Sequence, residues 1–333
     1  MRIVVTGSAG FIGFHLCNKL LESGHDVFGL DCLSDYYDVN LKRDRHFQLT
    51  KHARFVEIIV DLTDVKKTFE IFQVHKPQIV IHLAAQAGVR YSIDHPDSYI
   101  SSNLVGTYSV LEAVRNSDVQ HFLFASTSSV YGSNRTLPYS ELQKTDHQLS
   151  FYAGTKKTGE ILSHSYSHLY DIPTTCFRFF TVYGPWGRPD MALFKFTKAI
   201  LEGDTIEVYN NGEMYRDFTY VGDIVNAIDL LIQRQPELNL PVSNIDSLSE
   251  VAPWRVVNIG NSTSEKLMDF IEILEDTLGF KAEKLLKPLQ PGDVESTWAD
   301  CSLLEELTGY KPNTSIKKGI SEFVSWYRNY YQI

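Results

Sequence analysis

Up to about residue 180, the chain alternates short apolar runs rich in β-branched residues with amphipathic stretches. Runs of the first kind favour strands, and stretches of the second kind are typical of helices. We expect strands at residues 3–6, 26–30, 55–60, 79–83, 122–125 and 174–179, and helices near residues 11–23, 64–75, 98–116 and 151–170. This alternation predicts an α/β fold, a Rossmann-type doubly wound parallel sheet with helices on both faces.

The pattern changes after Tyr183. Residues 184–189, Gly-Pro-Trp-Gly-Arg-Pro, cannot form a regular element, and the segments beyond them mix short strands, turns and helices. We therefore predict two parts, 1–180 and 181–333, the second a smaller α+β region, with the chain crossing between them. Residues 234–252 are polar and show neither period, which predicts a surface loop.

Composition narrows the class of protein. The 333 residues carry a net charge of −10 without a long basic block, so nucleic acid is not an expected partner. No apolar run reaches the length of a membrane span, and Met1-Arg2 leads directly into a strand, so we expect a cytoplasmic protein away from membranes. Cys17, Cys32, Cys176 and Cys301 form no Cys-x-x-Cys pair and are expected to be buried thiols.

A glycine-rich loop follows the first predicted strand and opens the first helix. Its glycines Gly7, Gly10 and Gly13 allow a tight turn and a close approach of backbone N–H groups to a pyrophosphate, with Phe11 and Ile12 in the first helical turn. Asp31 ends the second strand, where a carboxylate accepts hydrogen bonds from a ribose and repels a 2′-phosphate. The pattern predicts a bound dinucleotide, NAD rather than NADP. Asp61 and Leu62 end the third strand, placed either to meet the adenine or to cap the next helix.

Tyr152 and Lys156 stand four residues apart on a predicted helix, so both can reach one ligand. A phenol is a poor base at pH 7 unless nearby positive charge favours its ionised form, and Lys156 and a nicotinamide ring supply such charge. Residues 125–132, a hydroxyl-rich run that includes Thr127, leave a carboxyl strand end where α/β sheets bind ligands. The hydroxyls of this run could bridge a sugar hydroxyl and the phenol.

These motifs resemble the extended short-chain dehydrogenase/reductase family, and within it the nucleotide-sugar 4-epimerases that act on UDP-glucuronate. The resemblance runs essentially from end to end. It rests on the glycine loop, the Tyr-x-x-x-Lys pair with Thr127, and the segments His82–Arg90, Asn103–Thr107 and Arg216–Phe218. The narrower assignment rests on Arg178–Ala192 and on Gln290–Val294, which includes Pro291.

The resemblance implies a tightly held NAD+ that oxidises C4 of the sugar and returns the hydride to the other face. Tyr152 would remove the O4 proton, Lys156 would bind the nicotinamide ribose and depress the pKa of Tyr152, and Arg216 and Asp293 would hold the UDP. The implied cofactor-binding residues are Gly7, Gly10, Phe11, Ile12, Gly13, Asp31, Asp61, Leu62, Leu83, Ala84, Ala85, Gln86, Asn103, Tyr152 and Lys156. The implied substrate-binding residues are Arg90, Thr127, Ser128, Thr181, Arg188, Met191, Ala192, Arg216 and Asp293.

Departures from related patterns favour an acidic sugar. Ser128 and Ser129 stand where sugar-nucleotide 4,6-dehydratases carry Asp and Glu, and UDP-glucuronate decarboxylases carry Glu at the second position. Thr181 and Gln290 replace the Asn and Arg that are typical of UDP-galactose-type epimerases. Arg188 is the candidate for the substrate carboxylate, because a guanidinium can bind it bidentately; a surface arginine fixed by its neighbours is the other interpretation.

Of three alternative functions, one remains open and two are set aside. A UDP-glucose or UDP-N-acetylhexosamine 4-epimerase is the main competitor, and a non-catalytic dinucleotide-binding sensor conflicts with the complete Thr127, Tyr152 and Lys156 set. His164 and His168 have the spacing of a zinc pair, but no third ligand accompanies them, so no metal is expected. The resemblance also implies a homodimer formed through residues 98–116 and 151–170.

Overall fold

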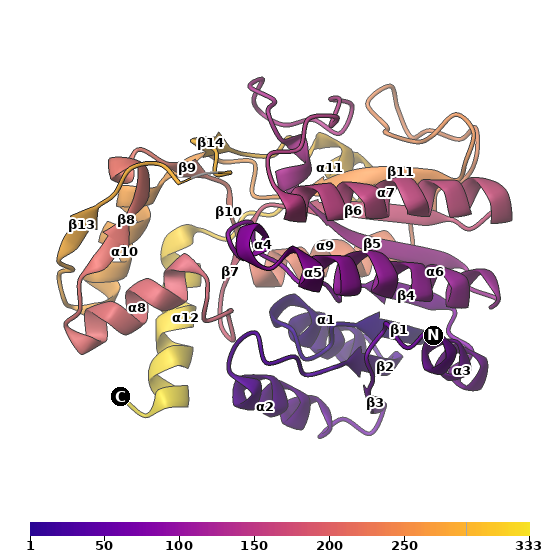
Figure 1. The fold of residues 1–333 in the computed structure, drawn as a ribbon, viewed down its shortest axis with the longest axis horizontal. Helices are drawn as coiled ribbons and strands as arrows, with labels where there is room; N and C mark the ends of the chain where they lie inside the picture. The colour runs from indigo at the N-terminus through magenta and orange to yellow at the C-terminus, as the bar shows by residue number, and fades with distance from the viewer. Residues whose placement is uncertain (291) are drawn as a thin grey trace.

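A seven-stranded parallel sheet forms the centre of the molecule (Figure 1). The computed structural model describes residues 1–290 and 292–333; Pro291 lies outside the described residues. From one edge to the other the strands are β11 (Trp254–Ile259), β6 (Thr174–Phe179), β5 (His121–Thr127), β4 (Ile79–His82), β1 (Arg2–Thr6), β2 (Asp26–Asp31) and β3 (Phe55–Ile59). All neighbouring pairs are parallel, which confirms the predicted doubly wound α/β fold.

Helices cover both faces of the sheet, because alternate side chains of each buried strand point to opposite sides. One apolar layer joins the sheet to α1 (Phe11–Glu22), α9 (Val221–Ile232) and α11 (Ser302–Thr308). The other joins it to α3 (Val65–His75), α6 (Gly106–Arg115) and α7 (Phe151–Tyr170). Two of these six helices, α9 and α11, and strand β11 come from beyond residue 180, so the chain returns to the main sheet after leaving it.

Two helical segments differ from the sequence prediction. The helix expected at 98–116 consists of α5 (Pro96–Tyr99), a π-helical stretch η1 (Ile100–Val105) and α6. Helix α2 (Val39–Leu49) was not predicted, because it buries Lys42, Arg45 and His46 beside its two buried leucines, so that polar side chains interrupt the apolar stripe. Periodicity of apolar residues cannot detect a helix whose buried face is polar.

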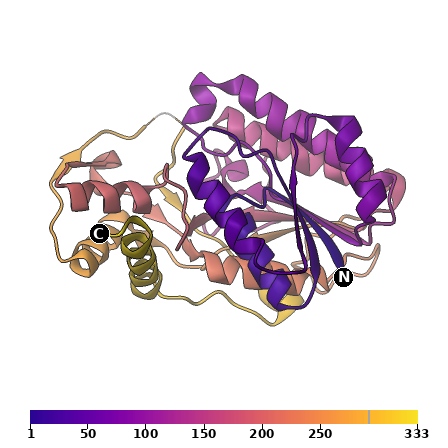
Figure 2. The same ribbon diagram turned by 90° about the horizontal axis from the view of Figure 1, so that it is seen from below.

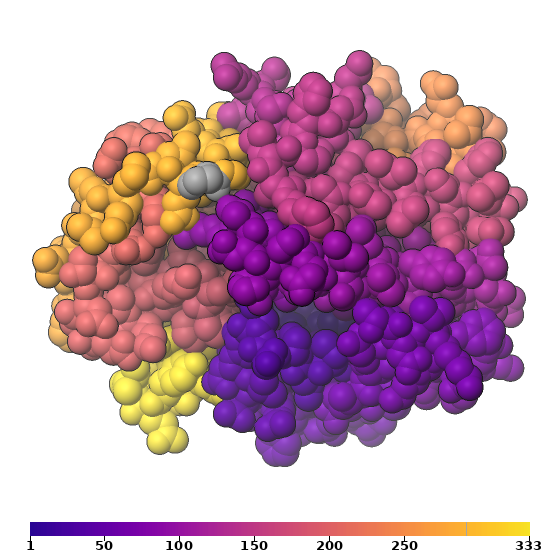
Figure 3. All heavy atoms as spheres, viewed as in Figure 1, coloured from indigo at the N-terminus to yellow at the C-terminus, as the bar shows by residue number. Residues whose placement is uncertain are grey.

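The C-terminal segments form a smaller α+β region at one end of the sheet, as predicted. Figure 2 shows this region on the side opposite the N-terminus, and Figure 3 shows it on the left. Its core is shared by the helices α8 (Ala192–Glu202), α10 (Leu267–Leu278) and α12 (Ile316–Tyr331). Its short strands pair as β7 (Thr181–Tyr183) with β10 (Phe218–Tyr220), β8 (Ile206–Val208) with β13 (Lys284–Leu286), and β9 (Tyr215–Arg216) with both β12 (Glu265–Lys266) and β14 (Ser296–Thr297).

The remaining short elements are α4 (Tyr91–Asp94), η2 (Ser128–Tyr131) and η3 (Tyr209–Gly212). Residues 234–252 contain no helix or strand, as predicted, and the two histidines set aside as metal ligands bind this loop. His164 hydrogen-bonds the hydroxyl of Ser249 at 2.8 Å, and His168 hydrogen-bonds the carbonyl of Val251 at 2.6 Å. Among the described residues, no helix is long and apolar enough to span a bilayer.

The strand order reverses between β1 and β4, because β2 and β3 lie on one side of this pair and β5, β6 and β11 on the other. Ligands of open α/β sheets bind at such a switch point, at the carboxyl ends of the strands. The loops that leave β1, β4 and β5 there carry the predicted cofactor and catalytic residues.

Candidate active site

The glycine-rich loop after β1 has the tight geometry that its sequence predicts. Gly7 adopts a left-handed backbone conformation with φ of 76°, and a Cβ added to it would lie 2.8 Å from the amide nitrogen of Ala84. A Cβ on Gly13 would lie 2.0 Å from the carbonyl oxygen of Gly7. Only glycine fits at these positions, and the loop runs directly into the N-terminus of α1, where Phe11 and Ile12 begin the helix. This cradle suits a dinucleotide pyrophosphate.

Asp31 links the glycine loop to the end of β2. Its carboxylate accepts hydrogen bonds from the backbone N–H groups of Ala9, at 3.0 Å, and Leu33, at 2.8 Å. Two carboxylate oxygens offer about four acceptor sites, so these bonds leave capacity for ribose hydroxyls. Cys32 beside it is exposed, which makes the prediction of a buried thiol wrong at this position; the other three cysteines are buried.

The segment after β4, with Leu83, Ala84, Ala85 and Gln86, is fixed mainly through its backbone. Asn103 of η1 accepts a hydrogen bond from the Gln86 N–H at 2.8 Å and donates to the Gln86 carbonyl at 3.0 Å and to the Thr155 hydroxyl at 2.9 Å. The Asn103 side chain therefore joins this segment to α7, one residue before Lys156.

At the end of β3, Asp61 accepts hydrogen bonds from the backbone and hydroxyl of Thr63, while Asp64 supplies the N-cap of α3. Leu62 lies against Gly106 of α6. The alternative role considered for Asp61, that of helix cap, therefore belongs to Asp64.

The predicted catalytic residues meet at the carboxyl end of β5 and the first turns of α7. Ser150 caps α7 by accepting a hydrogen bond from the Ala153 N–H at 3.1 Å, which fixes where the helix begins. Tyr152 packs edge-on against Tyr99, with ring centroids 6.0 Å apart. Burial raises the pKa of the Tyr152 phenol, and a hydrogen bond from Thr127 and the positive charge of Arg188 oppose this rise.

Lys156 is buried one turn further along α7. Burial lowers its pKa to about 8, against the opposing effects of Cys176 and Glu160. Its ammonium lies 4.5 Å from the ring centroid of Phe124. The groups that oppose the pKa rise of Tyr152 are Thr127 and Arg188, and the effect of Lys156 on this phenol, which the resemblance implies, stays a prediction.

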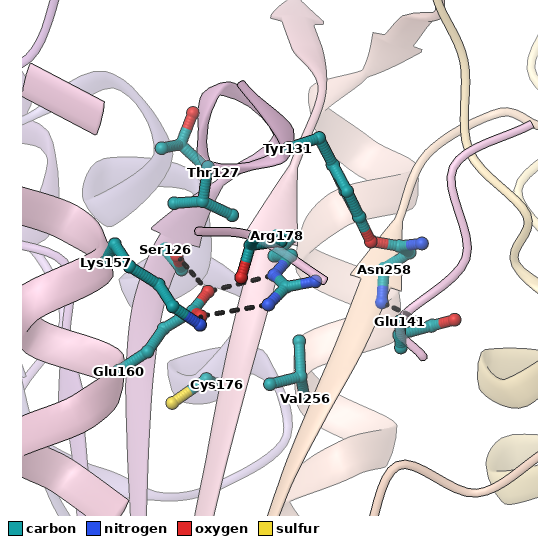
Figure 4. A network of polar contacts seen from close by, with 12 residues as sticks. Ser126, Thr127, Tyr131, Glu141, Lys157, Glu160, Cys176, Arg178, Val256 and Asn258 are labelled. Atoms are coloured by element: carbon teal, nitrogen blue, oxygen red, sulfur yellow. Dashed lines mark hydrogen bonds and ion pairs between the residues drawn. The ribbon is translucent and has the colours of Figure 1, made fainter. Parts of the chain in front are cut away.

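A buried ion pair joins helix α7 to strand β6 near the predicted catalytic residues (Figure 4). Glu160 of α7 accepts two hydrogen bonds from Arg178 of β6, both at 2.9 Å, and one from the hydroxyl of Ser126 at 2.6 Å. Ser126 directly precedes Thr127. The network therefore ties together the three elements β5, β6 and α7, on two of which the catalytic residues lie. Sequence reasoning missed Glu160, although it stands four residues after Lys156.

Arg188 lies on the loop after β7, and its guanidinium has an acidic partner in Asp190. Its Nε and Nη2 donate to Asp190 at 3.0 and 2.5 Å, and Nη2 also contacts the carbonyl of Ala87 at 3.3 Å. Tyr36 donates to the same Asp190 carboxylate at 3.1 Å. Within the described residues, Nη1 of Arg188 makes no hydrogen bond. The substrate candidates Thr181, Met191 and Ala192 line one cavity together with Arg188 and Phe11.

The three residues predicted for the UDP group come together from distant parts of the chain. Asp293 accepts a hydrogen bond from Nη2 of Arg216 at 2.9 Å and pairs with Arg90 at 3.8 Å. The Arg90 guanidinium lies 4.5 Å from the ring centroid of Tyr209. Two cations share one carboxylate, so the cluster keeps a net positive charge that suits a diphosphate. Ser128 begins η2, directly after Thr127.

The chain was compared with known proteins. A family model described as GDP-mannose 4,6 dehydratase matches residues 4–323. A protein named probable UDP-glucuronate 4-epimerase, from Rhizobium meliloti, is 47% identical over 335 aligned residues, which cover 100% of this chain and 98% of the relative.

Two solved structures have the same fold. The UDP-glucuronic acid 4-epimerase of Bacillus cereus, in complex with UDP-glucuronic acid and NAD, superposes with a TM-score of 0.89 at 33% identity, covering 99% of this chain and 100% of that one. The UDP-glucose 4-epimerase of Thermotoga maritima, with UDP-glucose, gives a TM-score of 0.85 at 29% identity, with the same coverage.

Proposed function

Because the chain belongs to the extended short-chain dehydrogenase/reductase family, we propose that it interconverts UDP-glucuronate and UDP-galacturonate with bound NAD+. When bound, NAD+ accepts a hydride from C4 of the sugar and gives it back to the opposite face, so no net oxidation occurs. The glycine loop, in which Gly7 and Gly13 have no room for a Cβ, supports binding of the NAD+ pyrophosphate. Asp31 supports binding of its adenosine ribose.

Tyr152 is the proposed general base. It takes the proton from the O4 hydroxyl as C4 becomes a ketone, and returns it when the ketone is reduced. Thr127 holds the sugar hydroxyl and the phenol in one hydrogen-bonded line, and the Lys156 ammonium binds the nicotinamide ribose. The ketone sugar turns over between the two half-reactions, while Arg90 and Arg216 hold the UDP group in place.

Arg188 carries the assignment of an acidic sugar. Its positive charge opposes the pKa rise of Tyr152, and it lines one cavity with Thr181 and Met191. A 4-keto uronate is a β-keto acid that loses CO2 when its carboxylate bond aligns with the carbonyl π system. A guanidinium that holds the carboxylate out of alignment protects the intermediate. Ser128 and Ser129 offer hydroxyls where the related dehydratases have carboxylates, so no acid or base for elimination stands there.

UDP-glucose 4-epimerase is the second candidate. One observation favours it: Asp190 already neutralises Arg188, so a neutral sugar could bind without disturbing this pair. An acidic sugar must use Nη1 of Arg188 or exchange with Asp190. The likeness to a UDP-glucose 4-epimerase structure also fits this alternative.

Deuterium labelling tests the proposed reaction. Purified protein is incubated with UDP-glucuronate that carries deuterium at C4, and the products are separated and analysed by NMR. Formation of UDP-galacturonate that retains the deuterium at C4 supports the proposal, because the hydride returns to the carbon from which it came. The absence of conversion, or turnover of UDP-glucose alone, contradicts it.

We also propose a cytoplasmic homodimer. The outer faces of η1, α6 and α7 expose several large apolar side chains, namely Ile100, Val105, Tyr108, Phe151, Ile161 and Leu169. Packing these faces against a second copy removes them from water. Four free cysteines suit a reducing compartment such as the cytoplasm.

A further inference from the structure

Helix α2 contains a buried cation whose role the proposed reaction does not explain. Arg45 is fully buried and ranks among the largest fully buried side chains of the described residues. Its Nη1 donates to the carbonyl of Ala9 in the glycine loop and to the phenol of Tyr37, both at 2.8 Å. Its Nη2 donates to the carbonyls of Trp186, at 2.6 Å, and Gly187, at 3.4 Å.

No carboxylate of the described residues forms an ion pair with Arg45, and its buried Nε has no hydrogen-bond partner there. Burying a charge that contacts only neutral acceptors costs free energy, because hydrogen bonds to neutral groups replace its hydration only in part. Apolar residues of similar size would bury the same area without this cost. The position of its four partners therefore indicates what Arg45 does.

Two of these partners, Trp186 and Gly187, directly precede Arg188. Trp186 has φ of 58°, a left-handed backbone conformation that residues other than glycine rarely adopt. His15 of α1 hydrogen-bonds the carbonyl of Pro185 at 2.8 Å, so a second side chain from the cofactor side holds the same turn. Such strain persists only where surrounding contacts fix the backbone, and Arg45 contributes two of them.

We propose that Arg45 is a positioning residue for substrate specificity: it fixes the Trp186–Gly187 turn against the glycine loop and thereby sets the place of the Arg188 guanidinium. This inference rests on the proposed function, in which Arg188 binds the uronate carboxylate. Selectivity for acidic sugars then depends on a residue that touches neither the sugar nor the reacting atoms. The planar guanidinium of arginine makes this possible, because Nη1 donates to the glycine loop while Nη2 donates to the Trp186–Gly187 turn.

The variant Arg45→Lys tests the inference, since it keeps the charge and removes the fork. Arg255→Lys is the matched control, because Arg255 of strand β11 is also buried but forms an ion pair with Asp246 at 3.1 Å. NAD content, hydrogen–deuterium exchange of residues 184–191, and the affinities for UDP-glucuronate and UDP-glucose are measured on NAD-loaded protein.

We expect Arg45→Lys to exchange faster at residues 184–191 and to bind UDP-glucuronate about tenfold more weakly, with UDP-glucose affinity changed by less than about twofold. The control should match the wild type in both measurements. If Arg45→Lys does not fold, Tyr37→Phe removes one acceptor of the same guanidinium and should shift both measurements in the same direction by a smaller amount.

Three results would overturn the inference. The first is unchanged exchange at residues 184–191, and the second is an equal loss of affinity for both sugars. The third is a loss of NAD with normal sugar affinity in the loaded fraction, which would assign Arg45 to the cofactor pyrophosphate. If the wild type shows no preference for UDP-glucuronate, the proposed function fails, and the exchange measurement still decides whether Arg45 fixes the turn.

Discussion

Tyr152 is the residue on which the proposed proton transfer depends. Replacing it by Phe keeps the ring that packs against Tyr99 and removes only the hydroxyl. We expect Tyr152→Phe to retain its fold and its NAD content while turnover falls by roughly two to four orders of magnitude, the usual contribution of a general base. Steady-state kinetics with UDP-glucuronate measure this. Activity within about tenfold of the wild type would assign proton transfer to another group.

We expect Asp31 to determine the choice between NAD and NADP. A 2′-phosphate at the ribose would meet a carboxylate whose oxygens already face the glycine loop. Like-charge repulsion should favour NAD over NADP by about tenfold or more. Calorimetric titration of cofactor-depleted protein with each dinucleotide measures the ratio. Equal affinities would show that Asp31 only stabilises the loop.

The residue types in the site were predictable from the sequence, whereas their pairing was not. Tyr152, Lys156 and Thr127 follow from helical spacing and from the position of a strand end. The pairing of Arg188 with Asp190 and Tyr36 depends on a loop that follows β2 and on a turn with an unusual backbone angle, neither of which has a periodic signal. The hydrogen bonds from Arg45 to Trp186 and Gly187 depend on the same turn and could not be predicted either.

At the scale of elements, the Glu160–Arg178 pair holds α7 to β6 beneath the catalytic residues (Figure 4). Removing one partner leaves an uncompensated buried charge. We expect Glu160→Ala to lower the free energy of unfolding by about 3–5 kcal/mol. Urea denaturation followed by circular dichroism measures this loss.

Lys157→Ala is the control for this prediction. Lys157 pairs with the same carboxylate at 3.1 Å but is partly exposed, so its removal should lower stability by no more than about 1 kcal/mol. Equal losses in the two variants would show that the buried pair contributes no more than an ordinary surface ion pair.

The six predicted strands and the four predicted helices have an apolar pattern strong enough to locate them. Strand β11, residues 254–259, belongs to the main sheet although part of the chain between β6 and β11 lies in the smaller region. A sequence pattern identifies local elements, but it does not say which sheet a late strand enters. Helix α2 was not predicted because three of its five buried side chains are polar or charged.

For the whole molecule, the exposed apolar faces of η1, α6 and α7 predict a dimer. Ile161 lies near the middle of α7 and is 55% exposed. A charge at this position would have to be buried in the dimer, so Ile161→Glu should shift the molar mass in light scattering from that of a dimer to that of a monomer. Leu240→Glu, on the loop 234–252, is the control, because Leu240 is similarly exposed elsewhere. A monomeric wild type, or a dimeric Ile161→Glu, would contradict the proposed interface.

The proposed function requires that the protein selects an acidic sugar through Arg188. The most direct test compares kcat/KM of the wild type and of Arg188→Ala for UDP-glucuronate and UDP-glucose, together with the fraction of UDP-pentose formed. We expect wild-type preference for UDP-glucuronate, and in Arg188→Ala a loss of roughly 2–5 kcal/mol of transition-state binding for UDP-glucuronate alone, with more UDP-pentose. Equal losses for both sugars, or a wild type that prefers UDP-glucose, would contradict the account.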